Sequence, residues 1–119
     1  GRGRMAKVRT LARRGDIYWV ALDPAIGSEI KKTRPAVIVS NNSCNTFGSR
    51  VVVLPLTSNV DSLYPGEVMV IVNGKPARVL GDQIRSLDKS RLQSRIDTLS
   101  QEELAAVDEA IRITLALLP

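Results

Sequence analysis

Short runs of β-forming residues, separated by polar loops, occupy most of the sequence up to residue 84. Each run is rich in Val, Ile, Leu, Tyr or Trp and is bounded by Gly, Pro, Asn, Asp or Ser, a pattern typical of strands joined by turns. The predicted strands span residues 15–22, 35–41, 51–56, 67–72 and 77–84, with a last short strand near 95–99. Five or six strands this closely spaced favour a small curled antiparallel sheet or barrel, mainly β with helices.

Local signals refine this strand pattern. Residues 51–56 are apolar on both faces, which predicts a central strand. Asn73 and Gly74 stand between two β-rich runs, which predicts a tight hairpin. Residues 42–50 are a polar crossing with room for one helical turn. The connections over residues 23–34 and 57–66 are long for a compact domain, and long loops are often functional.

The sequence ends in a predicted amphipathic helix over residues 100–118. Ser100 and Glu103 stand in the capping-box relation, which marks its start. Apolar residues follow at helical spacing, so we expect one stripe of the helix to pack on the sheet. The stripe consists of Leu104, Val107, Ile111, Thr114 and Leu118.

The chain length of 119 residues suits one compact domain, which we assign to residues 13–119. Residues 1–12 are predicted to be a basic disordered tail, of which 1–4 look like a cloning remnant. The formal net charge is +5, with 17 Lys and Arg against 12 Asp and Glu. Residues 1–10 hold four of the basic residues and no acid, so the remaining 13 basic and 12 acidic residues give a charge of +1. The basic balance is therefore weak evidence for nucleic-acid binding.

The cysteine and histidine contents exclude several kinds of chemistry. The single cysteine, Cys44, cannot form an internal disulfide, and we expect it to be a small semi-buried residue. With no signal peptide in the sequence, this favours the reducing cytoplasm. The sequence has no histidine, which excludes His-dependent triads and His-based metal sites. We expect no metal and no cofactor, and no apolar run is long enough to span a membrane.

A cluster of charged residues lies just before the second predicted strand. Glu29, Lys31, Lys32 and Arg34 fall within the stretch GSEIKKTRP, residues 27–35. One interpretation is a solvated loop with scattered charges. The other is functional, because Arg34 directly precedes a rigid strand and a positioned guanidinium recognises phosphate through its planar set of donors.

Polar residues follow two other predicted strands in the same way. Thr57 and Ser58 end the third strand, where a hydroxyl commonly caps a turn. Asp82 and Gln83 either satisfy hydrogen bonds at the sheet edge or face a ligand. Trp19 is either a core residue or a platform on which a base stacks.

Together, three stretches resemble the MazF/PemK family of toxin endoribonucleases. They are RRGDIYWVALDPAIGSEIKKTRPAVIVSN at 13–41, VVVLPLTSN at 51–59 and GDQIRSLDKSRL at 81–92. The resemblance implies a small SH3-like barrel of the CcdB/PemK type with a C-terminal helix, assembled as a homodimer. It also implies cleavage of single-stranded RNA, mostly messenger RNA, at short sequences without a metal, and inhibition by a cognate antitoxin protein.

The same resemblance implies roles for individual residues. In this family the arginine of the RP pair and the threonine of the LTS element carry catalysis, and here these are Arg34 and Thr57. Glu29 is the candidate general base, with Asp82 in reserve. The residues implied to bind RNA are Ser28, Lys31, Lys32, Ser58, Asp82, Gln83 and Arg85. Some relatives have a histidine where Ser28 stands and an arginine where Leu80 stands, so a mechanism that uses those two groups does not carry over.

The implied reaction starts with attack of an RNA 2′-hydroxyl on the neighbouring phosphorus and leaves a 2′,3′-cyclic phosphate and a 5′-hydroxyl. Arg34 suits stabilisation of the phosphorane charge. It does not suit the general base, because a guanidinium with a pKa above ~12 rarely gives up its proton. Thr57 would bond a phosphate oxygen or hold the attacking ribose.

Two other functions are compatible with such a fold. The gyrase poison CcdB shares it but binds its target protein without cutting RNA, and in that reading Arg34 and Thr57 are incidental. A barrel that only binds nucleic acid or serves a structural purpose is the third reading. Discrete fragments from a long single-stranded RNA incubated with chelator would separate the nuclease from both.

Overall fold

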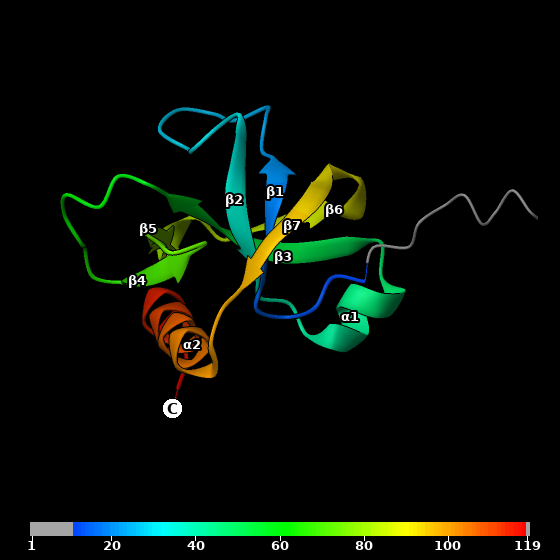
Figure 1. Cartoon of the computed structure of the whole chain (residues 1–119). Coiled ribbons are helices and arrows are strands. Elements are labelled where there is room, and N and C mark those ends of the chain that lie inside the picture. The colour runs from blue at the N-terminus through cyan, green and yellow to red at the C-terminus, as the bar shows by residue number, and fades with distance from the viewer. Residues whose placement is uncertain (1–10, 119) are drawn as a thin grey trace, which may run out of the picture.

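The computed structural model describes residues 11–118, which form one curled antiparallel sheet, a short helix and a longer C-terminal helix (Figure 1). The strands and helices, in chain order, are β1 Asp16–Ala21, β2 Thr33–Ile38, α1 Asn42–Phe47, β3 Arg50–Thr57, β4 Glu67–Val72, β5 Lys75–Leu80, β6 Arg85–Asp88, β7 Leu92–Thr98 and α2 Gln101–Leu115. Two single-turn 3₁₀ helices, η2 Gly81–Gln83 and η3 Lys89–Arg91, flank β6.

The sheet confirms the predicted fold class. Its strand order is β4-β5-β3-β2-β1-β7, and β6 pairs separately with β3. Strand β3 pairs with β2, β5 and β6, so the strand predicted to be central is central. The strand that the sequence pattern did not predict is β6, in which Leu87 is the one buried residue. The seven strands curl into a half-barrel, with α2 lying below β4 in the view of Figure 1.

The apolar residues of the inner strands divide between two cores because successive side chains of a strand point to opposite faces. On β2, Ala36 and Ile38 belong to one core, whereas Val37 belongs to the other. The first core lies among β1, β2, β3, β6 and β7, and the second extends over β4, β5 and Val107 of α2. Burial on both faces fixes the register of these strands, since a slip of one residue would exchange the two sets of side chains.

The predicted hairpin and helix cap are both present. Asn73 and Gly74 join β4 to β5 with φ values of 49° and 78°, as a two-residue hairpin turn requires. Ser100 and Glu103 form the capping box of α2. The predicted end of the helix is wrong by three residues, because Ala116 takes the left-handed conformation and ends the helix at Leu115. Leu118 is therefore outside the packed stripe and is 88% exposed.

Two further expectations concern the ends and the cysteine. Residues 1–10 of the predicted tail lie outside the described residues, whereas Ala12 is buried in the first core. The expectation that Cys44 is semi-buried is wrong, since it is exposed on α1. Among residues 11–118, no helix has the length and apolar character needed to cross a membrane.

Carboxylates from two other elements cap the outer edge of β4. The Glu103 carboxylate of α2 accepts the backbone N–H of Ile71 at 2.8 Å. The Asp97 carboxylate of β7 accepts the N–H of Asn73, at the end of β4, at 2.9 Å. These amides alternate along the strand, as edge amides do, so both contacts satisfy backbone groups that no strand pairs with.

Candidate active site

A pocket of about 390 Å³ lies where β2 begins and β3 ends, within the range of small-ligand sites. Its lining combines an apolar floor with a polar rim. The lining residues are Trp19, Arg34, Pro35, Leu56, Thr57, Ser58, Val72, Asn73, Lys75, Pro76, Ala77 and Ile96. Both residues implied to be catalytic, Arg34 and Thr57, therefore line one pocket.

The pairing of β2 with β3 explains why these two residues meet. Ala36 pairs with Pro55 in an antiparallel register. Arg34 lies two residues before Ala36 and Thr57 two residues after Pro55, so both stand just beyond the paired residues, at the same end of the two strands. Neighbouring strands lie about 5 Å apart, so side chains at adjacent strand ends can line one pocket. Two segments separated by more than twenty residues thus bring a guanidinium and a hydroxyl to one place.

The charge of the pocket suits an anion. Its lining includes two cations, Arg34 and Lys75, and no carboxylate among the described residues. The Nε of Arg34 donates to the carbonyl oxygen of Lys31 at 3.2 Å, which orients the guanidinium. No hydrogen bond joins its two terminal nitrogens to another residue in the range 11–118. Those nitrogens form the planar pair of donors that recognises phosphate.

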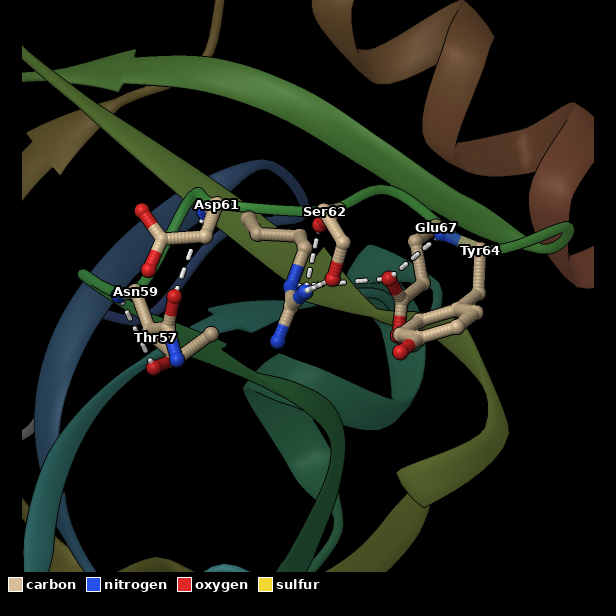
Figure 2. Close-up of polar contacts among 7 residues, drawn as sticks. Thr57, Asn59, Asp61, Ser62, Tyr64 and Glu67 are labelled. Atoms are coloured by element: carbon tan, nitrogen blue, oxygen red, sulfur yellow. Dashed lines mark hydrogen bonds and ion pairs between the residues drawn. The ribbon is translucent and has the colours of Figure 1, made fainter.

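The hydroxyl of Thr57 is held by its own loop. Its Oγ1 accepts the backbone N–H of Asn59 at 3.2 Å, and Figure 2 shows this turn at the start of the loop. Because this bond uses a lone pair of the oxygen, the hydroxyl proton remains available for a ligand. Thr57 is thus oriented as a donor.

Trp19 forms the aromatic wall of the pocket. It is 41% exposed, whereas its neighbour Tyr18 is 7% exposed and belongs to the first core. Trp19 pairs with Pro35 across β1 and β2, which places the indole beside the start of β2. Of the two interpretations of Trp19, the geometry favours an exposed aromatic surface over a core residue.

The predicted base and the predicted lysines lie on the loop between β1 and β2, outside the pocket lining. The Glu29 carboxylate accepts the backbone N–H of Ile26 at 2.7 Å, so it closes a turn within this loop. Ser28 and Lys31 are exposed. Lys32 adopts a left-handed φ of 71°, and its N–H donates to Asp23 at 2.9 Å. The hydrogen bond from Lys32 to Asp23 thus joins the two ends of the loop, and Lys31 and Lys32 are exposed on it.

The DQIR segment supports that loop instead of lining the pocket. Gln83 Oε1 accepts the backbone N–H of Ile30 at 2.8 Å. The Arg85 guanidinium donates to the carbonyl oxygens of Leu22 and Ile30 at 3.4 and 3.5 Å. Asp82 is exposed on η2. Gln83 and Arg85 therefore anchor the loop between β1 and β2, whereas the sequence analysis offered hydrogen bonds at the sheet edge for Gln83 and no structural role for Arg85.

The hairpin between β4 and β5 contributes residues that the sequence analysis missed. Lys75 and Asn73 both line the pocket. The signal for Lys75 was present, since a cation directly follows a predicted hairpin turn, but nothing in the sequence placed that turn beside Arg34. Asp97 fixes the hairpin from β7, and hydrogen bonds from the N–H groups of Asn73 and Thr98 hold the pKa of that carboxyl below its usual value.

These features define a small curled β-sheet protein with a cationic pocket where β2 begins and β3 ends. Residues 13–115 match the family described as "PemK-like, MazF-like toxin of type II toxin-antitoxin system". The chain belongs to this family of endoribonuclease toxins, as its sequence motifs indicated.

Individual relatives agree with this membership. The chain is 40% identical over 116 residues to endoribonuclease MazF9 of Mycobacterium tuberculosis (strain ATCC 25618 / H37Rv), covering 90% of this chain and 98% of that protein. It is 33% identical over 113 residues to endoribonuclease EndoA of Bacillus subtilis (strain 168), covering 91% and 97%.

Solved structures of MazF proteins also resemble this chain. The crystal structure of MazF from Deinococcus radiodurans matches with a TM-score of 0.82 and 28% identity, covering 92% of this chain and all of that one. A MazE–MazF complex of the same bacterium matches with a TM-score of 0.75 and 25% identity, covering 92% and 100%. The comparison thus includes a toxin of this fold in complex with its partner.

Proposed function

We propose that this protein is a sequence-specific endoribonuclease toxin that cleaves single-stranded RNA, chiefly messenger RNA, by metal-independent attack of a 2′-hydroxyl. The observation that carries the proposal is that Arg34 and Thr57 line one pocket, whose lining among the described residues contains two cations and no carboxylate. Such a pocket fits a phosphodiester better than a neutral or cationic ligand. The names of the two relatives, both endoribonucleases, support the same activity.

In the proposed mechanism the scissile phosphate lies between Arg34 and Thr57. The guanidinium neutralises the charge that grows on the phosphorane oxygens, and it acts as a fixed donor rather than a mobile ion. The Thr57 hydroxyl donates to a phosphate oxygen and helps to align the ribose. Trp19 offers a flat surface to a neighbouring base, a contact that unpaired RNA can make and a stacked duplex cannot.

The proposed general base is Glu29, with Asp82 in reserve. Glu29 bonds its own loop in the free protein. To accept the 2′-hydroxyl proton, its carboxylate must leave the amide of Ile26 and enter the pocket as RNA binds. The loop therefore has to close over the substrate, as catalytic loops commonly do. As the 2′-oxygen bonds to phosphorus, the bond from phosphorus to the 5′-oxygen breaks, and this leaving oxygen takes a proton from the Arg34 guanidinium, because neutral guanidine is a weaker base than an alkoxide. The products would be a 2′,3′-cyclic phosphate and a 5′-hydroxyl.

The partners follow from the family. We propose that the protein acts as a homodimer in the cytoplasm and that a cognate antitoxin neutralises it by occupying the pocket and the loop around Lys31 and Lys32. The MazE–MazF complex supports the existence of such a partner for a toxin of this fold. The cation pair Arg34 and Lys75 would attract an acidic or aromatic segment of the antitoxin.

The experiment that tests the function uses a long single-stranded RNA, the protein and excess chelator. Discrete fragments that end in a 2′,3′-cyclic phosphate and a 5′-hydroxyl, identified by mass spectrometry, are expected. A short RNA with deoxyribose before the cut should resist cleavage, because the attacking hydroxyl is absent. Intact RNA would overturn the proposal in favour of a CcdB-like poison, and 5′-phosphate products that need magnesium would overturn the mechanism.

A further inference from the structure

The loop between β3 and β4, residues 58–66, borders the pocket but is poorly held by packing. It begins directly after Thr57, and its first residue, Ser58, lines the pocket. Leu63 and Tyr64 in this loop are 55% and 60% exposed. A segment with so few buried side chains has low local stability unless polar contacts order it. The polar contacts that hold this loop therefore affect the shape of the pocket beside it.

Arg78 of β5 supplies the contacts that order this loop. Its guanidinium donates to the carbonyl oxygen of Ser62 and approaches the Ser62 hydroxyl at 3.4 Å. It also lies 5.9 Å from the centre of the Tyr64 ring, within range of a cation–π contact. A single side chain thus holds two residues in the middle of the loop.

The far end of the loop is tied to the same arginine through Glu67. The Glu67 carboxylate lies 3.5 Å from Arg78 Nε and accepts the backbone N–H of Tyr64 at 3.0 Å. Figure 2 shows Thr57, Asn59 and Asp61 at the left of the view, Ser62 in the middle, and Tyr64 and Glu67 at the right. The side chains of Arg78 and Glu67 are only 12% and 11% exposed, so the pair is shielded from water.

The position of Arg78 in the sheet connects this cluster to the site. Arg78 is the residue paired with Thr57 across β3 and β5. Their side chains therefore leave the same face of the sheet side by side. The first half of the loop continues from Thr57 through two turns. The backbone N–H of Asn59 donates to Thr57 Oγ1, and the backbone N–H of Asp61 donates to Asn59 Oδ1 at 3.1 Å.

We propose that Arg78 is a positioning residue that holds the 58–66 loop in the conformation that receives RNA beside Thr57, so that RNA affinity and the choice of cleavage site depend on it. The inference rests on the proposed function and adds a residue outside the pocket lining. Arg78 does not touch the substrate. It acts through the loop, which presents Ser58 and the side-chain Nδ2 of Asn59 to the nucleotides next to the cut.

An arginine is required at position 78 because its contacts with Ser62, Glu67 and Tyr64 lie in different directions. A guanidinium has five N–H donors in a rigid fork, so it can engage Ser62, Glu67 and the Tyr64 ring together. A lysine carries one compact charge. It can keep the ion pair with Glu67 but cannot also reproduce the bonds to Ser62. Arg78→Lys therefore separates the stability of the fold from the order of the loop.

The test compares Arg78→Lys with Arg50→Lys as a matched control. Arg50 lies at the end of β3 opposite to Thr57 and also binds a serine. Its guanidinium donates to the Ser86 hydroxyl and carbonyl oxygens at 2.8 and 3.0 Å. Hydrogen exchange of the loop amides is measured on the free proteins. Cleavage is measured as kcat, KM and the distribution of cut sites on a long RNA. A double variant, Arg78→Met with Glu67→Gln, removes both charges while keeping the buried volume.

For Arg78→Lys we expect loop amides to exchange about tenfold faster, because loss of the Ser62 bonds releases the segment. KM should rise roughly fivefold to tenfold, since RNA must now order the loop as it binds. The kcat should stay within about threefold of wild type because Arg34 and Thr57 are held by the sheet. Cuts should spread to additional sites. The double variant should show the same pattern, and Arg50→Lys should show none of it.

Loop exchange and KM in Arg78→Lys that match those of Arg50→Lys would overturn the inference. A fall in kcat with unchanged KM and unchanged cut sites would also overturn it. Failure of the wild-type protein to cut RNA is a separate result, which overturns the proposed function and the role in RNA binding, whereas the exchange data still report whether Arg78 orders the loop.

Discussion

The carbonyl oxygen of Gly66 lies against Gly81 so closely that a Cβ atom on Gly81 would stand 2.0 Å from it. Gly66 closes the 58–66 loop, and Gly81 begins η2, which carries Asp82 and Gln83. The Thr114 hydroxyl of α2 adjoins both glycines, at 2.9 and 3.3 Å from their hypothetical Cβ atoms. Three elements that support the site therefore converge on a point with no room for a side chain.

Gly81→Ala should destabilise the protein by about 2–3 kcal/mol, because the added methyl meets backbone, which cannot move aside as a flexible side chain can. For a domain of this size the melting temperature should fall by roughly 10 °C. Gly74→Asn is the control, since Gly74 has open space around its hypothetical Cβ and asparagine tolerates its left-handed φ. Equal melting temperatures for the two variants would contradict the close approach.

Arg34→Ala should lower the single-turnover cleavage rate by ~10²-fold or more, as expected for loss of a preorganised charged donor. Arg34→Lys should restore only part of the rate, because a point charge lacks the paired donors of a guanidinium. Binding of a deoxyribose-blocked RNA should persist, since Lys75 and the apolar floor remain. Undiminished cutting by Arg34→Ala would refute the mechanism.

Lys75→Gln should weaken RNA binding and reduce its salt dependence. Each phosphate contact with single-stranded nucleic acid contributes about 0.7 to the slope of log affinity against log salt, so the slope should become shallower by roughly that amount. The measurement is a titration of deoxyribose-blocked RNA at several salt concentrations. Lys89→Gln on η3, outside the pocket, is the control, and the same slope in both variants would remove Lys75 from the site.

Asp97→Asn should make stability less dependent on pH in the acid range. The pKa of Asp97 lies below the ordinary value of 3.8 because it accepts the N–H groups of Asn73 and Thr98, with Arg95 adding a smaller effect. The carboxylate therefore stabilises the fold fully above that ordinary value, and the contribution is lost as pH falls through the folded pKa. Urea unfolding from pH 7 to pH 2.5 should show the two proteins converging at the acid end.

Asp61→Asn is the control for this experiment, since it changes a carboxylate that is exposed on the 58–66 loop. A constant difference between wild type and Asp97→Asn at every pH would show that the carboxylate acts by packing and not by charge.

Leu115→Lys combined with Leu117→Lys should shift the protein from dimer to monomer in sedimentation equilibrium at micromolar concentration. Ile113, Leu115 and Leu117 near the C-terminal end of α2 are 59%, 47% and 53% exposed, a density of apolar surface that suggests a covered face. Ile26→Lys, at an exposed residue of the loop between β1 and β2, should leave the mass unchanged. A wild-type protein that sediments only as a monomer would contradict the proposed assembly.

Local patterns in the sequence predicted the parts of this fold that local chemistry controls. The capping box at Ser100 and the left-handed turn at Asn73 and Gly74 need only neighbouring residues. Strand β6 was missed because Leu87 is its one buried residue, and its pairing with β3 supplies the order that propensity does not. The end of α2 was misplaced because a left-handed Ala116 leaves no signal, unlike the usual glycine.

The residues of the candidate site likewise divide into those that the sequence predicted and those that only the fold brings to the site. The motifs predicted Arg34 and Thr57, and the pairing of β2 with β3 brings the strand ends that carry them to one pocket. Lys75 could not be assigned, because its place beside Arg34 depends on how β4 and β5 fold back over the strand ends. The contacts that Gln83 and Arg85 make in the free protein are with backbone groups more than fifty residues away in the chain, and their predicted contact with RNA stays a prediction. Contacts at that separation leave no trace in a single sequence.

The two carboxylates that cap β4 also determine how this protein can meet other chains. An exposed strand edge is a template on which a foreign strand can add, and such addition leads to edge-to-edge aggregation. Here an incoming strand would have to displace Glu103 and Asp97 from the amides of Ile71 and Asn73. Growth of the sheet from this side is thereby opposed, so we do not expect a partner chain to bind by extending the β4 edge.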